Sequence, residues 1–296
     1  MKILLLGKNG QVGWELQRSL APLGEVVALG RNSTELCGDF ANPEAVVDAM
    51  RTVRPDVIVN AVAHTAVDRA ENEPGLARQI NAVVPGMLAQ EAAQLKALLV
   101  HYSTDYVFDG SGNTPWREGD ATGPLSVYGR TKLEGERRIQ QAGGAHLILR
   151  TSWVYAARGG NFAKTMLRLA QERDSLSVID DQWGAPTGAD LLADVTAHAV
   201  RHLRSRPEEG GLYHCVAGGE TTWHAYAGYV IEQARKIQPA LAIKAKEIHA
   251  VPTSAFPTPA RRPQNSRLDT QKLQTTFGLH LPHWQRGVAR MLHEIL

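Results

Sequence analysis

The sequence predicts an α/β fold, namely a doubly wound parallel sheet followed by a smaller mixed α/β part. Residues 2–6 form a continuous apolar run, which is typical of a parallel strand buried on both faces. A glycine-rich turn follows, and apolar residues then recur at helical spacing over 12–20. The same strand–helix order repeats as far as residue 151, which favours a parallel sheet with helices on both faces.

Each element of this first part has its own local signal. Short apolar runs predict strands at 2–6, 25–29, 57–59, 97–103 and 146–151. Helical periodicity predicts helices at 12–20, 43–54, 75–96 and 126–142. Asn42 is suited to cap the second helix and Pro43 to occupy its first turn. Pro85 lies inside the third helix and should bend or split it.

The pattern loosens after residue 150, and we place a domain boundary there. Residues 151–296 are expected to pack on residues 1–150, with some segments returning to the first sheet, because no low-complexity linker separates them. Four prolines between 251 and 267 predict an irregular loop. The elements expected in this part are helices at 161–173, 189–204, 222–238 and 282–296, and strands near 177–179 and 212–216.

Composition excludes several classes of protein. The chain has 296 residues, of which 43% are hydrophobic and 21% charged, so it can bury a sizeable core. A formal net charge of +2 gives no footprint for nucleic acid or an anionic membrane, and no apolar run approaches the ~20 residues of a membrane span. Cys37 and Cys215 match neither a disulfide framework nor a metal-ligand spacing. We therefore expect a cytoplasmic protein with two reduced thiols.

The glycines at 7, 10 and 13 lie between the first strand and the first helix. Glycine permits a tight turn and lets the backbone approach a phosphate closely, while the helix directs free N–H groups at the anion. A glycine triplet alone is a weak signal, since glycines also serve ordinary turns, but its place between strand and helix strengthens it. The sequence therefore predicts that residues 1–150 bind a dinucleotide.

The residue that follows the second strand usually distinguishes the two nicotinamide cofactors. A carboxylate there binds the ribose 2′-hydroxyl, whereas a basic group accommodates a 2′-phosphate. Here Gly30 is followed by Arg31, Asn32 and Ser33, with no carboxylate before Glu35. Arg31 can pair with a phosphate and so favours NADPH. NADH stays open, because Arg31 can also be read as an ordinary solvated charge.

Tyr128 and Lys132 are four residues apart on a predicted helix, so their side chains lie on one face. A phenol has a pKa near 10, and a nearby ammonium should lower it and help the phenol to exchange a proton. Thr104 ends a predicted strand at the carboxyl edge of the sheet, where ligands bind in such folds. Its hydroxyl could bind a substrate carbonyl and join the proton network of Tyr128.

With these motifs, the chain resembles the extended short-chain dehydrogenase/reductases, which have the Rossmann fold. Within that family it is most similar to reductases of dTDP-linked 4-keto-6-deoxysugars. The resemblance covers nearly the whole length. The segments that carry it are 7–13, 37–40, 60–68, 103–108, 128–132, 150–155, 181–187 and 262–268.

The resemblance implies roles for individual residues. The catalytic set would be Thr104, Tyr128 and Lys132. The dTDP-sugar substrate would contact Thr104, Asp105 and Trp153, although a tryptophan after a strand is more often part of a core. The cofactor would lie against Gly7, Gly10, Gln11, Val12, Gly13, Arg31, Asp39, Phe40, Ala61, Ala63, Thr65, Tyr128 and Lys132.

One absence distinguishes reduction from dehydration. Related nucleotide-sugar 4,6-dehydratases carry an Asp-Glu pair after the threonine, because eliminating water needs both a base and an acid. Here Asp105 is followed by Tyr106, so we expect a simple reduction of the ketone at C4. The alternatives are a reductase of another dTDP-4-keto-6-deoxysugar and a non-catalytic NADP-binding regulatory subunit.

Some members of the family form a homodimer bridged by Mg²⁺, and Glu15 matches one of the bridging positions. Gln285 stands where another acid would be needed, and Glu294 is the acid that remains nearby. Hard cations need several oxygen ligands. We therefore expect no metal-bridged dimer, and we expect Glu15 to be an ordinary solvated helix residue.

Overall fold

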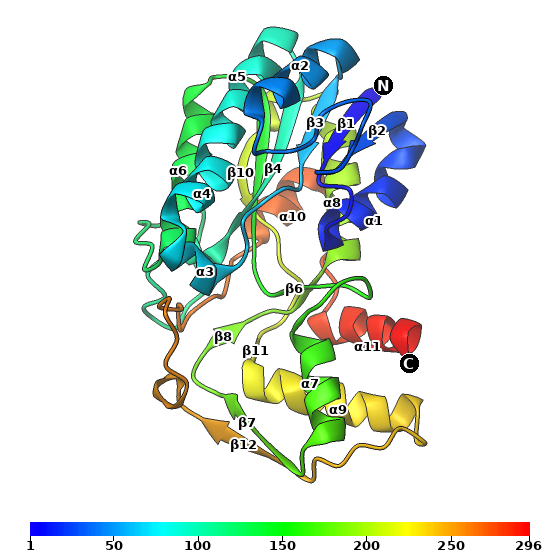
Figure 1. Cartoon of the computed structure of the whole chain (residues 1–296), viewed down its shortest axis with the longest axis vertical. Coiled ribbons are helices and arrows are strands. Elements are labelled where there is room, and N and C mark those ends of the chain that lie inside the picture. The colour runs from blue at the N-terminus through cyan, green and yellow to red at the C-terminus, as the bar shows by residue number, and fades with distance from the viewer.

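The computed structural model describes residues 1–296, and its centre is a six-stranded parallel sheet (Figure 1). The strand order is β10-β5-β4-β3-β1-β2. The chain moves outward from β1 to β2 and then returns to the other side of β1 with β3, so the carboxyl ends of β1 and β3 flank the switch point of the topology. The strands are β1 (Lys2–Leu6), β2 (Glu25–Leu29), β3 (Val57–Asn60), β4 (Leu98–Thr104), β5 (His146–Thr151) and β10 (Gly211–His214).

Helices cover both faces of this sheet, which confirms the predicted doubly wound fold. Ile3 and Leu5 of β1 face one layer, whereas Leu4 and Leu6 face the other, because successive side chains of a strand alternate. The first layer consists of α1 (Gln11–Leu20), α8 (Ala189–Leu203) and α10 (Gln271–Phe277). The second consists of α2 (Pro43–Val53), α5 (Val84–Leu95) and α6 (Val127–Gln141).

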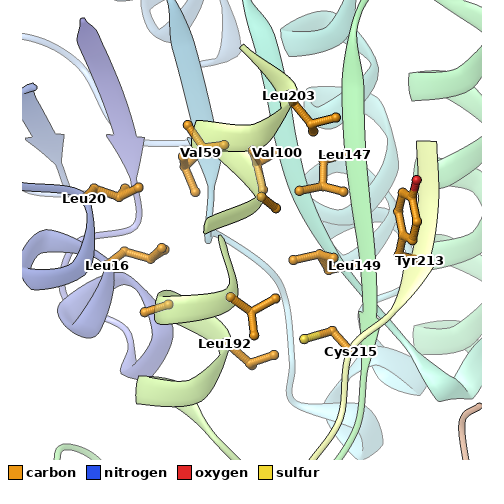
Figure 2. Packing of buried hydrophobic residues seen from close by; sticks show 14 of the residues in the cluster. Leu16, Leu20, Val59, Val100, Leu147, Leu149, Leu192, Leu203, Tyr213 and Cys215 are labelled. Atoms are coloured by element: carbon orange, nitrogen blue, oxygen red, sulfur yellow. The ribbon is translucent and has the colours of Figure 1, made fainter. Parts of the chain in front are cut away.

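The core between the sheet and the first layer joins distant parts of the chain (Figure 2). Leu16 and Leu20 of α1 and Leu192 and Leu203 of α8 pack over the sheet, and all four are at most 3% exposed. Side chains from β3, β4, β5 and β10 meet them from the sheet. Helix α8, β10 and α10 come from the second half of the sequence, so that half contributes directly to the main sheet.

Most of the remaining elements form a smaller region beside the carboxyl ends of the strands (Figure 1). Its helices are α7 (Phe162–Glu172), α9 (Trp223–Ile237) and α11 (Trp284–Ile295). Its short strands form three two-stranded pairs: β7 (Ser175–Ile179) with β12 (Glu247–Val251), β8 (Trp183–Gly184) with β11 (Thr221–Thr222), and β6 (Val154–Tyr155) with β9 (Thr187–Gly188).

The expected third helix is divided in the structure, as the position of Pro85 predicted. It is divided into α4 (Pro74–Arg78), a π-helical segment (Gln79–Val83) and α5, which begins one residue before Pro85. Proline cannot donate a backbone hydrogen bond, so the helix widens on its amino-terminal side. Two further helices, α3 (Val67–Asn72) and α10, were not predicted. None of the helices is both long and apolar enough to span a membrane.

We expect Gly13→Ala to destabilise the protein by roughly 3 kcal/mol, at the upper end of overpacking costs. A Cβ atom at Gly13 would lie 2.0 Å from the carbonyl oxygen of Gly7, which is backbone and cannot move aside cheaply. Urea unfolding measures the change. Gly228 in α9 has nothing within 4 Å of its built Cβ, so Gly228→Ala should add about 0.5–1 kcal/mol through helix propensity. Equal stability of Gly13→Ala and wild type would contradict this account.

Candidate active site

A first cleft, which we call the glycine cleft, opens at the carboxyl ends of β1, β2 and β3 and has a volume of about 380 Å³. Seven of the residues predicted to hold the cofactor line it: Gly7, Gly10, Arg31, Asp39, Phe40, Ala61 and Ala63. Phe40 is only 3% exposed and also packs in the core beneath the cleft. It therefore stabilises the core as well as lining the cleft.

The floor of the glycine cleft is backbone. Gly7 has a φ of 94°, a conformation that favours glycine, and a Cβ there would lie 2.9 Å from the carbonyl carbon of Ala61. Helix α1 starts at this turn with Gly10 as its N-cap, no side-chain cap and no acidic residue in its first turn. Its first N–H groups therefore have no side-chain partner, which suits a phosphate anion. The residues present fit a dinucleotide pyrophosphate.

The outer end of the glycine cleft carries both a base and an acid. The Arg31 guanidinium is 78% exposed and lies 3.9 Å from the Asp39 carboxylate. Ser33 does not extend into open solvent, because its Oγ accepts a hydrogen bond from the N–H of Gly30 at 3.0 Å and fixes the turn. The sequence has no carboxylate directly after β2. Asp39, nine residues after Gly30, nevertheless reaches the same end of the glycine cleft in the folded chain. The cleft can therefore contact either a 2′-phosphate or a 2′-hydroxyl.

A second cleft, the Tyr128 cleft, adjoins the first and shares Gly10, Ala61 and Ala63 with it. Its volume is about 480 Å³. The structure thus brings together residues from the start of α1, the segment after β3, the end of β4, α6 and the segment after β5, as the resemblance implied. The predicted site residues that line it are Gln11, Val12, Thr65, Thr104, Asp105, Tyr128, Lys132 and Trp153. Gly13 lines neither cleft; it allows α1 to pack against the Gly7 turn.

Tyr128 is placed by the start of α6. Ser126 caps this helix, its side chain accepting from the N–H of Gly129 at 3.2 Å. A Cβ at Gly129 would lie 2.2 Å from the carbonyl oxygen of Tyr106, so the glycine lets α6 approach the turn that follows β4. This close approach puts Tyr128 in the same cleft as Thr104.

Burial shifts the pKa values of both Tyr128 and Lys132, and the shift of Tyr128 is opposite to the one expected from the sequence. Burial raises the pKa of Tyr128 to about 12, against the opposing effect of the nearby Thr104 hydroxyl. Burial also lowers the pKa of Lys132 to about 8, although Glu136 on the same helix favours the charged form. The prediction that Lys132 lowers the phenol pKa is therefore wrong for this state. Lys132 Nζ instead contacts the carbonyl oxygen of Tyr102 at 2.5 Å and Nε2 of His101 at 3.1 Å.

Thr104 and Asp105 end β4 inside the Tyr128 cleft. The Thr104 hydroxyl donates to Asp105 Oδ1 at 3.0 Å and accepts from the N–H of Tyr106 at 3.2 Å. Asp105 Oδ2 is buried and has no hydrogen-bond partner, and the same is true of the hydroxyls of Ser103, Thr151 and Ser152. All four residues line the same cleft. Unpaired buried polar atoms are rare, and their gathering here fits a ligand rich in hydroxyl groups.

Trp153 closes the cleft from the smaller region. It adopts a φ of 50° and stacks on Trp223 with ring centroids 3.6 Å apart and an interplanar angle of 16°. Trp223 starts α9 and donates through Nε1 to Gln182 Oε1 at 3.1 Å. A Cβ at Gly184 would lie 2.7 Å from the Trp153 ring, so the glycine makes room for it.

Sequence reasoning missed eight of the residues that line the Tyr128 cleft, and three of them are large aromatic side chains. Trp223 is seventy positions from Trp153, and no local pattern links the two. Tyr106 was read only as a missing glutamate, yet its ring packs against Tyr128 edge to face at 5.4 Å. Tyr102 contributes its carbonyl oxygen to Lys132, a contact that side-chain chemistry does not reveal.

Glu15 lies outside both clefts, in a smaller cavity of about 250 Å³ with Asp190 and Glu294. Two arginines form ion pairs with two of these acids: Arg18 lies 3.4 Å from Glu15, and Arg290 lies 3.1 Å from Asp190. The chain shows no group of three or more acidic, histidine or cysteine side chains arranged to hold a metal ion.

Fold and site together define a dinucleotide-binding protein of the extended short-chain dehydrogenase/reductase class. The family model for the RmlD substrate binding domain matches residues 1–296. A dTDP-4-dehydrorhamnose reductase from Salmonella typhimurium is 62% identical over 295 residues, covering 100% of this chain and 98% of the relative. The chain therefore belongs to the RmlD family of dTDP-4-dehydrorhamnose reductases.

Solved structures agree with this assignment. A dTDP-4-dehydrorhamnose reductase from Clostridium acetobutylicum superposes with a TM-score of 0.88 at 35% identity, covering 100% of this chain and 99% of the other. The enzyme of the same name from Bacillus anthracis, solved in complex with NADP, gives a TM-score of 0.87 at 31% identity, covering 99% of each chain.

We expect Asp105→Asn to raise stability most above pH 6. Burial raises the pKa of Asp105 from 3.8 to about 6, against the opposing effect of the Thr104 hydroxyl, which donates to Oδ1. The folded protein therefore binds this proton more tightly than the unfolded chain, so the wild-type free energy of unfolding falls as pH rises from about 4 to 6. Asparagine cannot ionise, so Asp105→Asn should be about 2–3 kcal/mol more stable than the wild type at neutral pH. Any weakening of the hydrogen bond from Thr104 would reduce this gain.

Urea unfolding of both proteins between pH 4.5 and 7.5 measures this difference. The exposed carboxylate of Asp109 has a lowered pKa because it accepts from Ser111, so Asp109→Asn serves as a control without the gain. A stability difference between Asp105→Asn and wild type that stays constant with pH would show that Asp105 does not titrate in this range.

Proposed function

We propose that this protein reduces the C4 ketone of dTDP-4-dehydro-β-L-rhamnose to dTDP-β-L-rhamnose, with NADPH as the hydride donor. The observation that carries the proposal is the meeting of Thr104, Tyr128 and Lys132 in one cleft that adjoins the glycine cleft. The name shared by its relatives at about 60% identity supports this particular substrate.

Tyr128 is the proton donor in this proposal. A phenol with a pKa of about 12 keeps its proton at neutral pH, and this is the form that ketone reduction requires. As C4 receives hydride, its oxygen gains negative charge and takes the phenolic proton, and the phenolate later regains a proton from solvent. The Thr104 hydroxyl lies in the same cleft and can donate to that oxygen as the charge develops.

A bound reduced nicotinamide would supply the hydride. Gly10, Gln11 and Val12 would hold the pyrophosphate at the start of α1, and Arg31 would pair with a 2′-phosphate at the outer end of the glycine cleft. Asp39 and Phe40 would lie by the adenine, and Ala61, Ala63 and Thr65 would line the path between the two clefts. Lys132 would bind the ribose hydroxyls.

We infer that the sugar nucleotide is held between the carboxyl ends of β4 and β5 and the part of residues 151–296 outside the main sheet. Trp153 and Asp105 would contact the deoxysugar, together with the unpaired hydroxyls of Ser103, Thr151 and Ser152. Tyr106 occupies the place of the dehydratase glutamate, so that position offers no carboxylate for eliminating water. Burial raises the pKa of the Tyr106 phenol, which therefore keeps its proton.

Two further inferences rest on this chemistry. The reaction consumes a reduced nicotinamide, and the chain has two free thiols, so we infer that it works in the cytoplasm. A homodimer stays a prediction. We propose that any such dimer forms without a bridging Mg²⁺, because Arg18 and Arg290 already neutralise the acids around Glu15.

Tyr128→Phe should lower kcat for ketone reduction by roughly 10²–10⁴-fold, because it removes the proton donor and leaves the ring. Loss of NADPH absorbance with the dTDP-4-keto sugar measures turnover, and fluorescence titration measures NADPH binding, which should change little. Tyr229→Phe is the control, since this hydroxyl bonds to the Gln285 carbonyl outside both clefts. Unchanged turnover in Tyr128→Phe would refute the assigned role.

Arg31→Ala should raise KM for NADPH roughly tenfold and leave KM for NADH nearly unchanged, because only the 2′-phosphate needs the guanidinium. Arg117 offers a matched control: it is also 78% exposed and pairs with an acid, Asp269 at 3.6 Å, outside the glycine cleft. A parallel increase of KM for both cofactors would contradict a phosphate-binding role for Arg31.

A further inference from the structure

The aromatic wall of the Tyr128 cleft, formed by Trp153 and Trp223, is tied to the smaller region by a row of hydrogen bonds. Trp223 Nε1 donates to Gln182 Oε1 at 3.1 Å, and Gln182 Nε2 donates to Thr253 Oγ1 at 3.1 Å. We propose that Gln182 is a positioning residue, which acts through Trp223 to hold Trp153 in the conformation that receives the sugar nucleotide. This inference rests on the proposed function.

The row has a single direction, which its two ends determine. An indole N–H can only donate, so the Gln182 amide must turn Oε1 toward Trp223 and Nε2 toward Thr253. The Thr253 hydroxyl accepts there and donates to Oδ1 of Asp181 at 2.5 Å. The Asp181 carboxylate also accepts from the backbone N–H of Thr253 at 2.9 Å. Gln182 is only 4% exposed, and its amide therefore has a partner at each end in one orientation.

The bond from Trp223 to Gln182 restricts a motion that ring packing leaves free. Trp223 is the first residue of α9, and its ring contacts Phe162 of α7 and stacks on Trp153. Dispersion contacts between rings are non-directional, so they allow one ring to slide or turn over another. A hydrogen bond at the edge of the indole is directional. Gln182 therefore fixes how the Trp223 ring is turned beneath Trp153.

Trp153 needs such support because its backbone is strained. A φ of 50° is unusual for a bulky residue and persists where the surrounding structure holds it. Gly184 leaves room for the Trp153 ring on one side, and the stack on Trp223 gives that ring a partner. Both tryptophans line the Tyr128 cleft, whereas Gln182 does not. Gln182 therefore influences the cleft through the aromatic wall and not by contact with a ligand.

The consequence concerns the order in which binding and ordering occur. An aromatic wall that is already fixed in the free protein spares a ligand the loss of side-chain freedom that it would otherwise impose. Without Gln182, part of the binding free energy of the sugar nucleotide would be spent on ordering Trp223 and Trp153. NADPH should be affected less, because neither tryptophan lines the glycine cleft.

Circular dichroism of the free protein tests the geometry without substrate or cofactor. Trp153 and Trp223 are the one pair of tryptophans whose rings are in contact, so an exciton signal of stacked indoles belongs to them, and Trp153→Phe should remove it. Gln182→Met removes both hydrogen bonds of the amide, nearly conserves volume and should lose most of the signal. A full signal in folded Gln182→Met would overturn the proposal.

Thr253 lies outside both clefts and therefore separates positioning from contact with the substrate. Thr253→Val removes the acceptor of Gln182 Nε2 and the donor to Asp181, so the amide loses its fixed orientation and the exciton signal should weaken. Thr253→Ser keeps the hydroxyl and should retain the signal. Equal signals in the valine and serine variants would contradict the role of the row.

Calorimetric titration of the intact protein with dTDP-rhamnose tests the consequence for binding. Gln182→Met should raise the Kd of dTDP-rhamnose roughly tenfold, which corresponds to about one hydrogen bond, and leave the Kd of NADPH nearly unchanged. Gln274→Met is the matched control, because Gln274 of α10 also donates to a threonine, Thr270 at 3.0 Å, outside both clefts.

Two failures are distinguishable in this titration. If the wild type and Gln182→Met bind dTDP-rhamnose equally, the inference about Gln182 is overturned and the proposed function stands. If the wild type binds no dTDP-rhamnose, the proposed function is refuted, and circular dichroism alone still decides whether Gln182 holds the aromatic wall.

Discussion

The close approach of α1 to the turn after β1 determines what this edge of the sheet can bind. There the Gly13 backbone lies so near the Gly7 carbonyl that a single methyl group would not fit, and Gly7 itself lies against Ala61 of the next strand. Because these contacts are made by backbone, the helix start, the turn and the end of β3 form one rigid floor. Both clefts share Gly10, Ala61 and Ala63 from this floor, so the position of one bound group fixes the position of the other.

Polar atoms in the neighbourhood of Lys132 divide into two kinds. Behind the lysine, Asn60 and His101 are fully buried and are hydrogen-bonded in a row. In front of it, Asp105 Oδ2 and three hydroxyls are buried without partners. The hydrogen bonds of Asn60 and His101 hold the residues behind Lys132 rigidly. The four unpaired groups in front of it are buried at a cost in free energy, because a buried polar group without a hydrogen bond is unfavourable. These unpaired atoms make the free protein less stable, and a ligand that forms hydrogen bonds with them removes that cost when it binds.

The sequence was most informative where local rules govern. Strand β2, strand β5 and the Asn42 cap lie where apolar runs and capping rules predicted them, because such features depend on a few adjacent residues. The carboxyl-edge position of Thr104 followed from the parallel sheet, and the one-face spacing of Tyr128 and Lys132 followed from helical geometry.

The missed features depend on residues far apart in the chain. Trp223 reaches the Tyr128 cleft through the packing of α9, and Asp39 reaches Arg31 through the fold of the segment after β2. The proton affinity of Lys132 depends on its burial, and its Nζ contacts a histidine thirty-one positions earlier. No spacing rule gives these contacts, because each requires the completed tertiary structure. Strand β12 escaped prediction for a similar reason: it is short, mostly exposed and paired only with β7.

The covering of the main sheet by α8 has a consequence for synthesis on the ribosome. Val100, Leu147 and Leu149 of the early strands pack against Leu192 and Leu203, and Ser19 bonds to Asp194 across 175 positions of sequence. A nascent chain that has just released β5 thus leaves an apolar sheet face uncovered until α8 emerges. Contacts of such sequence separation form slowly, so the half-made chain is a natural client for a chaperone that shields apolar surface.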